Sequence, residues 1–348
     1  VPSVPNALVK VTSYQQLQSI IHKYSLTADV VIQTAFGDSG KTTYFISSQD
    51  DYKRAAEKIE AEDTVKVMSR VNCLQVAIEA CTTRNGTYIG PVLTEIIGHP
   101  ELTPYPGGWC GNDVNPEAFS KQIRKTLFAY TEKLGDALYH LGYRGYFEVD
   151  YLIDADADAD NNVVYLGEIN PRVTGISALT NLSSYCNESI PLLAFHLLEY
   201  SDIDFDIEPK AFNQQVLNSK HKPFGQLIFK AVQNKLKIVT HIPHSGIYHI
   251  VNEQLEFVRF ANNSRAMADN EIYILRIIKE GDYIHKGADL VIVFANHLMQ
   301  DHIKKLYPVT KKLLKIIQAS IQSRELSDEE QQIVDRYAGC SSIKSSEQ

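Results

Sequence analysis

Hydrophobic and polar positions alternate along two stretches in the middle of the chain, and this pattern predicts a pair of strands. The first stretch, 145–153, reads GYFEVDYLI, and the second, 163–170, reads VVYLGEIN. Both are rich in β-branched and aromatic residues, and side chains alternate between the two faces of a strand. Two polar side chains therefore share a face on each strand: Glu148 and Asp150 on the first, Glu168 and Asn170 on the second. Pairing of the strands would gather three carboxylates and an amide oxygen on one patch.

The same kind of pattern predicts helices and further strands on both sides of this pair. Helices are expected over 13–24, 48–61, 116–141, 188–200, 309–322 and 328–338. Ser48 and Ser327 each begin an N-terminal capping box, and Asn115, Pro116 and Gly142 delimit the long third helix. Early strands are expected over 30–34, 42–46, 65–71, 73–80 and 87–92, and residues 224–295 are mostly strand. The predicted fold class is α+β.

The composition is that of an ordinary globular protein, because 44% of the 348 residues are hydrophobic and 22% are charged. A chain of this length predicts two or three substructures. The net charge of −8, without a long Lys/Arg run, excludes a general nucleic-acid binder. No apolar run approaches the roughly 18–20 residues of a membrane helix, and the start of the chain does not read as a signal peptide. We expect a cytoplasmic protein without a membrane partner.

The cysteines do not predict a zinc site or a disulfide framework, since the five of them are widely spread and none forms a C-x-x-C pair. Cys110 lies in a Gly-rich loop, where a nucleophile is one interpretation. No histidine motif accompanies it, so a buried thiol is the preferred one.

A glycine-rich loop lies between the two predicted strands 30–34 and 42–46, and it predicts phosphate binding. A P-loop is excluded because its first glycine would fall at Ala35 and because β-branched and aromatic residues follow Lys41 where a P-loop has a helix. Gly37 and Gly40 permit the backbone to approach an anion closely. Three residues would add side-chain donors: Ser39, Lys41 and Thr42. The alternative is an ordinary hairpin turn around Asp38-Ser39-Gly40.

The residue types of the polar patch suit a divalent cation. Carboxylate and amide oxygens bind hard cations such as Mg²⁺, which is held by a few carboxylates together with substrate phosphates. Arg172 follows directly and can grip phosphate or carboxylate with two parallel hydrogen bonds. A solvent-facing hairpin with one polar face is the alternative.

The string E-I-N-P-R at 168–172, with the glycine loop upstream, resembles the ATP-grasp superfamily, in which a D/E strand is followed by E-x-N-x-R. The biotin carboxylase-like and carboxylate–amine ligase branches are most similar. The resemblance implies two α+β subdomains that clasp ATP, followed by a mostly β C-terminal domain and terminal helices. We expect an ATP-grasp domain over 1–200, with a glycine-loop subdomain over 13–92 and a metal-binding subdomain over 93–200. The C-terminal domain would span 201–300, and helices and a polar tail 301–348.

The resemblance also implies site residues. ATP and Mg²⁺, with Mn²⁺ as an alternative, would be the cofactors. The nucleotide would contact Gly37, Asp38, Ser39, Gly40, Lys41 and Thr42, and the backbone of Val67 and Ser69 in the hinge strand. The metal would be held by Asp150, Glu168 and Asn170, with Glu148 as a further candidate, and Lys41 and Arg172 would be the catalytic cations.

This resemblance implies an ADP-forming ligase that activates a carboxylate as an acyl phosphate for attack by an amine or similar nucleophile. Its partners would be these small molecules, with a homodimer as one expected assembly. A biotin carboxylase-like enzyme that uses bicarbonate and a nucleotide-binding module without catalysis are the alternatives. The last is favoured by Gln33, which stands where the family carries a phosphate-binding lysine, and by the missing hinge glutamate. The family's N-terminal domain is also missing, and we expect a fragment or processed chain.

Three other features carry less weight. The loop 98–113 contains the only tryptophan and either covers the substrate or packs on the surface. The alternating aspartates at 154–160 lack the glycine and glutamate of a calcium-binding EF-hand loop. The turn KEGDYIHKGADL at 279–290 resembles biotinyl and lipoyl modules, but no lysine in the chain is flanked by methionine, so a biotin carrier is excluded.

Overall fold

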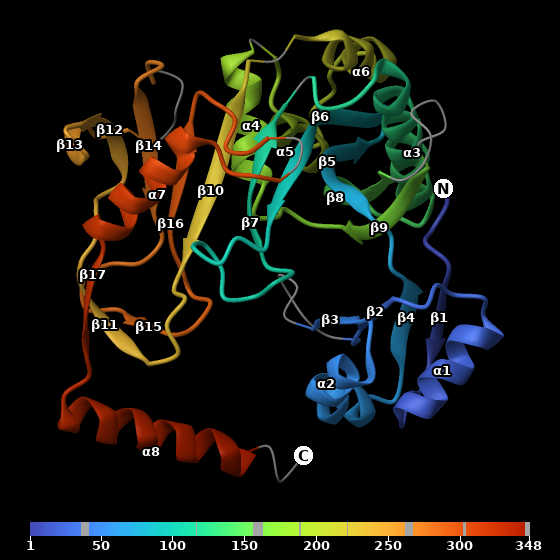
Figure 1. Cartoon of the computed structure of the whole chain (residues 1–348). Helices are drawn as coiled ribbons and strands as arrows, with labels where there is room; N and C mark the ends of the chain where they lie inside the picture. The colour runs from blue at the N-terminus through green and yellow to red at the C-terminus, as the bar shows by residue number, and fades with distance from the viewer. Residues whose placement is uncertain are drawn as a thin grey trace.

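The computed structural model describes residues 1–35, 42–115, 117–155, 163–187, 189–220, 222–261, 267–301 and 304–344. Within these residues the strands form sheets of four, ten and three strands (Figure 1). The smallest sheet joins β15 (Tyr283–Ile284), β11 (Lys237–His241) and β17 (Gln322–Glu325). The predicted α+β class is confirmed. None of the helices in the described part of the chain is both long and apolar enough to cross a membrane.

The four-stranded sheet belongs to a small N-terminal unit. Its order is β1 (Asn6–Val9), β4 (Val65–Ser69), β2 (Val30–Gln33) and β3 (Thr43–Ile46), with all pairs antiparallel. Helices α1 (Tyr14–Lys23) and α2 (Gln49–Ala61) cover one face and share a core with its inward residues. Both helices begin as the sequence predicts, because the hydroxyls of Ser13 and Ser48 accept hydrogen bonds from backbone N–H groups of the first turn.

The ten-stranded sheet forms the body of the molecule and begins at Cys73. Five strands come from its N-terminal part: β5 (Cys73–Thr83), β6 (Gly86–Ile97), β7 (Trp109–Val114), β8 (Gly145–Asp154) and β9 (Val164–Asn170). Five come later in the chain: β10 (Phe224–Lys230), β12 (Gly246–Val251), β13 (Gln254–Arg259), β14 (Glu271–Arg276) and β16 (Asp289–Ala295). The order is β13-β12-β14-β16-β10-β7-β6-β5-β8-β9. One sheet therefore carries strands from both sides of residue 200, and the domain boundaries stay a prediction.

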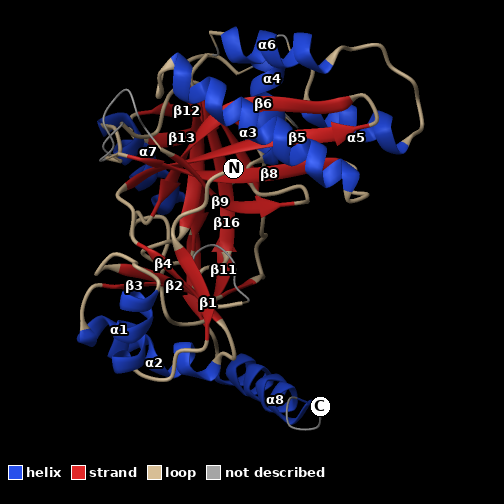
Figure 2. Cartoon of the chain, turned by 90° about the vertical axis from the view of Figure 1, so that its right-hand side faces the viewer, coloured by secondary structure: helices blue, strands red, loops and turns tan. Residues whose placement is uncertain are grey.

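Helices cover both faces of this sheet. Helix α3 (Lys121–His140) packs Leu127 and Phe128 against the inward side chains of β5 and β8. On the opposite face lie α4 (Ser177–Cys186) and α5 (Leu192–Tyr200). Helix α7 (Pro308–Ser320) covers the C-terminal strands. Helix α6 (Pro209–Asn218) contacts β6, and α8 (Asp328–Lys344) extends at the lower end of the molecule (Figures 1 and 2).

Several predicted boundaries are wrong. The long helix begins at Lys121 and not at residue 116, since its first turn is capped by the hydroxyl of Ser120, which accepts from the Ile123 N–H. The loop 98–113 ends in a strand, β7, which follows Gly107 and Gly108 and contains Gly111, and these glycines hid its β character. Residues 177–186, for which the sequence pattern predicted no helix, form α4. For β7 and α4, pairing and packing with distant elements outweigh local propensity.

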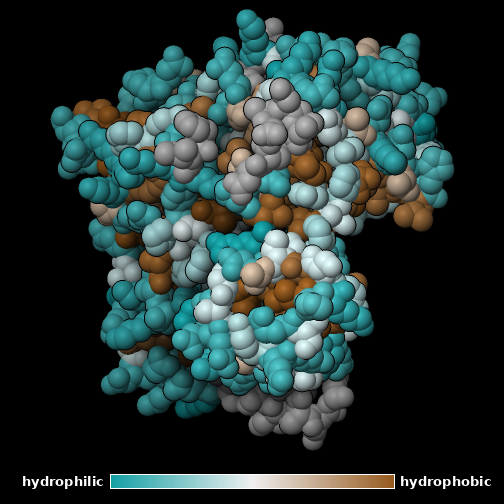
Figure 3. Space-filling model, turned by 45° about the vertical axis from the view of Figure 1, so that its right-hand side comes forward, coloured by the Kyte–Doolittle hydropathy of each residue, from teal (hydrophilic) through white to brown (hydrophobic). Residues whose placement is uncertain are grey.

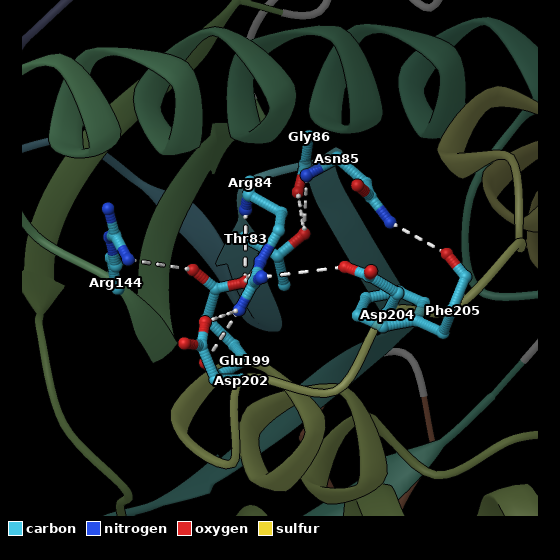
Figure 4. Close-up of polar contacts among 9 residues, drawn as sticks. All are labelled: Thr83, Arg84, Asn85, Gly86, Arg144, Glu199, Asp202, Asp204 and Phe205. Atoms are coloured by element: carbon cyan, nitrogen blue, oxygen red, sulfur yellow. Dashed lines mark hydrogen bonds and ion pairs between the residues drawn. The ribbon is translucent and has the colours of Figure 1, made fainter.

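The hairpin turn between β5 and β6 is tied to the end of α5 by ion pairs (Figure 4). Nε of Arg84 donates to the buried carboxylate of Glu199 at 3.2 Å, and its Nη2 donates to Asp202 at 2.8 Å. Asp204 lies 3.7 Å from the same guanidinium, and Arg144 reaches Glu199 from the other side at 3.5 Å. The ion pairs therefore join the β5–β6 hairpin and the start of β8 to the end of α5.

Candidate functional site

The two predicted strands pair and bring their polar residues together. β8 and β9 are antiparallel, with Glu148 opposite Asn170 and Asp150 opposite Glu168. Directly opposed residues point to the same side of a sheet, so all four lie on one face. The predicted alternation is thus confirmed, with Phe147, Val149 and Tyr151 buried on the other face.

The neighbouring strands add two carboxylates that the sequence did not single out. Glu79 of β5 lies opposite Glu148, and Glu95 of β6 lies close enough to raise the pKa of Asp150. We call Glu79, Glu95, Glu148, Asp150 and Glu168 the acidic patch. Nothing in the alternation of β5 or β6 marks these two residues, since their proximity depends on which strands are neighbours in the sheet.

The predicted site residues on this face are linked by hydrogen bonds. Nδ2 of Asn170 donates to Oδ2 of Asp150 at 3.4 Å, and Nη2 of Arg172 donates to Oδ1 of Asn170 at 3.2 Å. The other carboxylate oxygen of Asp150 is buried and has no hydrogen-bond partner in the described residues. Glu168 is exposed. An oxygen that is buried without a partner is costly unless a further group binds it.

The electrostatics of the acidic patch are unfavourable for so many ionised carboxylates. Burial, and then the charge of Glu79, raises the pKa of Glu148 to about 8. Burial, and then the charge of Glu168, raises the pKa of Glu95 to about 7. Burial, followed by Glu95 and Glu148, holds the pKa of Asp150 well above its usual range. A cation bound here would offset these penalties, because an opposite charge favours the ionised form.

The donor set fits Mg²⁺. Mg²⁺ binds through one or two carboxylates and completes its shell with water and phosphate oxygens, so Asp150, Glu168 and Asn170 are sufficient protein ligands. No group of three or more His, Cys, Asp or Glu side chains that could hold a metal by itself is found among the described residues. The unpartnered oxygen of Asp150 is the observation that favours a cation.

Two cations border the acidic patch. Arg172 is exposed at the end of β9. Lys304, which the sequence analysis missed, donates from Nζ to the carbonyl oxygen of Cys73 at 3.0 Å, and its charge lowers the pKa of Glu95. Lys304 is distant in sequence from every motif, so only the fold could reveal it.

The small N-terminal unit presents one uncovered sheet face toward β8 and β9. Val31 and Met68 on this face pack near Leu152 and Tyr165 of the large sheet. Gln33 and Lys66 lie on the same face, directly opposite each other in β2 and β4. Figure 3 shows the surface hollowed between this unit and the larger body above it.

The predicted nucleotide contacts are only partly placed. Gly37, Asp38, Ser39, Gly40 and Lys41 lie outside the described residues. The carbonyl oxygen of Thr42 accepts from the Thr34 N–H at 3.3 Å, just before β3.

The two hinge residues lie in β4, which has a neighbour on both sides. Val67 is paired with both neighbours, and the N–H of Ser69 donates to the carbonyl oxygen of Pro5. Adenine binding by their backbone stays a prediction.

Two other candidates are structural. Cys110 is fully buried and burial raises the pKa of its thiol to about 12, so it stays protonated and is no nucleophile. Trp109, from the same loop, is half-buried, and its Nε1 donates to Asn112 at 2.6 Å.

No protein-family model matches the sequence. No curated protein matches it either.

Solved structures do match, with low sequence identity. N5-carboxyaminoimidazole ribonucleotide synthetase in its ADP complex matches with a TM-score of 0.58 and 16% identity over 92% of this chain and 68% of that one. The biotin carboxylase of Campylobacter jejuni matches with a TM-score of 0.59 and 11% identity, and the match covers 93% of this chain and 64% of that one. The biotin carboxylase domain of the Hydrogenobacter thermophilus 2-oxoglutarate carboxylase matches with a TM-score of 0.57 and 9% identity. The match covers 94% of this chain and 64% of that one. The chain therefore spans about two thirds of these structures, and the predicted ATP-grasp fold is confirmed.

Proposed function

We propose that this chain is an ATP- and Mg²⁺-dependent, ADP-forming ligase that activates a carboxylate as an acyl phosphate for attack by an amine or similar nucleophile. The acidic patch carries the proposal, because buried carboxylates with an unpartnered Asp150 oxygen suit a cation that brings phosphate with it. The fold supports it: structures with this fold hold ADP, or MgADP together with bicarbonate.

Asp150, Glu168 and Asn170 would hold the metal. When bound, Mg²⁺ would neutralise charge on the phosphates of ATP as its terminal phosphoryl group is transferred and ADP is formed. The Asn170 amide keeps Asp150 oriented through its hydrogen bond at 3.4 Å.

Arg172 would hold the anionic oxygens that change charge during the reaction. Its guanidinium is exposed, and one nitrogen is fixed by Asn170, so the group is oriented before an anion arrives. In the first step an oxygen of the substrate carboxylate bonds to the γ-phosphorus and ADP leaves. In the second the nucleophile bonds to the acyl carbon, phosphate leaves, and the nucleophile releases its proton to solvent.

A biotin carboxylase-like reaction is the second candidate. It is favoured by two biotin carboxylases that match the chain with TM-scores of 0.59 and 0.57, close to the 0.58 of the N5-carboxyaminoimidazole ribonucleotide synthetase. It would consume bicarbonate and would release ADP only with biotin present.

ADP release is the discriminating measurement. The purified chain is incubated with Mg·ATP and panels of carboxylates with amines, and separately with bicarbonate and biotin. Turnover in the first set supports the ligase, and turnover confined to the second supports the carboxylase. ATP binding without turnover in any mixture contradicts both and favours a non-catalytic module, the reading that Gln33 suggests.

Glu168→Ala tests the metal assignment. Because Glu168 is exposed, its loss removes a metal ligand without opening the core, and turnover is expected to fall at least a hundredfold with an unchanged thermal midpoint. Glu256→Ala, which changes another exposed glutamate, on β13, is the control. Undiminished turnover in Glu168→Ala would refute the assignment.

A further inference from the structure

The turn between β9 and α4, residues 171–176, carries Arg172 and is held to three other strands. At its N-terminal end the turn contacts only neighbouring residues: the Arg172 N–H donates to the carbonyl oxygen of Asn170 at 2.8 Å. Its second end approaches β5, which carries Glu79 of the acidic patch, and also β7 and β10, which follow β6 in the sheet order.

Glu79 of β5 provides the first of these attachments. Its Oε1 accepts hydrogen bonds from the hydroxyls of Thr174, at 3.1 Å, and of Ser177. Its Oε2 accepts from the hydroxyl of Tyr146 at 2.6 Å. Ser177 in turn accepts from the N–H of Thr174 at 2.9 Å. Both oxygens of this fully buried carboxylate are therefore used, and two of the three donors belong to the turn and the first residue of α4.

Trp109 and Gln226 provide the other attachments. A Cβ on Gly175 would lie 2.5 Å from the Trp109 ring, so only glycine lets the turn approach it. Nε2 of Gln226 on β10 donates to the carbonyl oxygen of Gly175 at 3.0 Å. The turn is thus fixed at Gly175 by packing and by a backbone contact, and at Thr174 and Ser177 by one carboxylate.

We propose that Glu79 is a positioning residue for the ligase reaction: through Thr174 and Ser177 it fixes the turn that places Arg172 beside Asn170 and Asp150. The inference rests on the proposed function, since it assigns Glu79 to the same site. Glu79 itself has no vacant oxygen, so it acts through the turn and not on a substrate. A buried carboxylate lowers the stability of the fold, and an apolar side chain of similar size would lower it less. An apolar side chain could not, however, accept hydrogen bonds from the two hydroxyls of Thr174 and Ser177.

Ser177→Ala is the sharpest test, because it removes one donor to Glu79 and leaves the acidic patch intact. We expect kcat to fall about ten- to a hundredfold while the KM for Mg·ATP changes less than threefold, since misplacing a catalytic group costs rate rather than binding. Ser177→Thr keeps the hydroxyl and is expected to restore most of the rate. Ser184→Ala removes a buried hydroxyl of the same helix that donates to the Thr180 carbonyl oxygen, and it is the matched control.

A double-mutant cycle separates positioning from a general loss of stability. If Glu79 and Ser177 act through Arg172, then adding Ser177→Ala or Glu79→Gln to Arg172→Ala lowers kcat no further. Multiplicative losses, or a Ser177→Ala variant with the wild-type rate, would overturn the inference.

Binding and turnover of Mg·ATP by the wild type show whether a negative result contradicts the positioning role or the proposed function. If the wild type binds Mg·ATP without turning over any substrate, the ligase proposal fails, and the same cycle is measured on the Kd for Mg·ATP. Coupled effects of Ser177→Ala and Arg172→Ala on that Kd support the positioning role, and independent effects overturn it. A wild type that neither binds nor turns over Mg·ATP overturns both.

Discussion

The carboxylates of the acidic patch repel one another when they are ionised. Asp150 is the extreme case, because burial and the charges of Glu95 and Glu148 hold the pKa of its carboxyl well above its usual range. One of its oxygens is buried without a partner in the described residues. Such a residue lowers the stability of the metal-free chain, which is the usual compromise at a site built for a ligand.

Asp150→Asn is expected to stabilise the metal-free protein. A raised pKa means that the carboxyl penalises folding once the pH exceeds its unfolded value of about 3.9, and the amide removes that penalty. In EDTA at pH 7 to 8 the thermal midpoint should rise by about 2–5 °C, and the gain should vanish near pH 4. Added Mg²⁺ should stabilise the wild type and not the variant. Calorimetry with and without Mg²⁺ checks both, and a lower midpoint for the variant in EDTA would contradict the account.

Elements are joined by side chains that complete each other's hydrogen bonds. β7 pairs with β6 only over Leu93–Ile97, so the first half of β6 is not paired with it. Asn213 of α6 lies against that half. Its Oδ1 accepts from the Ile89 N–H at 2.8 Å, and its Nδ2 donates to the Thr87 carbonyl oxygen at 2.9 Å. One amide thus pairs as a neighbouring strand would.

Asn213→Ala is expected to destabilise the chain by about 2–4 kcal/mol, because it leaves a buried N–H and a buried C=O without partners. Gln214→Ala, on the exposed side of the same helix, is the control and should change stability by less than about 0.5 kcal/mol. Urea denaturation measures both. Equal midpoints for the two variants would show that α6 does not complete β6.

The whole molecule consists of two bodies that face each other across the candidate site. The small sheet has α1 and α2 on one face and turns its other face to β8 and β9. Lys66 lies on that face opposite Gln33, the residue that replaces the expected lysine. Within the described residues the Lys66 ammonium makes no ion pair, and the side chain is only partly buried. Lys66, on the strand next to Gln33, could therefore supply the positive charge for a phosphate that the neutral Gln33 side chain lacks.

Lys66→Ala is expected to raise the KM for Mg·ATP about tenfold, the loss of one charge-assisted phosphate contact, with a smaller effect on kcat. Lys58→Ala is the matched control, since Lys58 lies on α2, exposed on the covered side of the same sheet. Steady-state ADP release measures both variants. An unchanged KM in Lys66→Ala would exclude Lys66 from the phosphate site.

The sequence by itself determined the local features of the site. The faces of β8 and β9 follow from alternation, because side-chain direction in a strand has a period of two whatever the partner. The helix starts at Ser13 and Ser48 follow from hydrogen bonds within one turn. The string at 168–172 indicated the fold for a related reason, since the residues that carry the resemblance lie close together in the chain.

Only the tertiary structure decided which distant residues join that site. Glu79 and Glu95 enter the acidic patch because β5 lies between β6 and β8 in the sheet, and strand order is not encoded in the alternation of any one strand. The attachment of the turn at 171–176 depends on Trp109 and Gln226, which approach it only after β7 and β10 are placed in the same sheet. Local periodicity fixes where a side chain points, whereas packing between elements fixes what it meets.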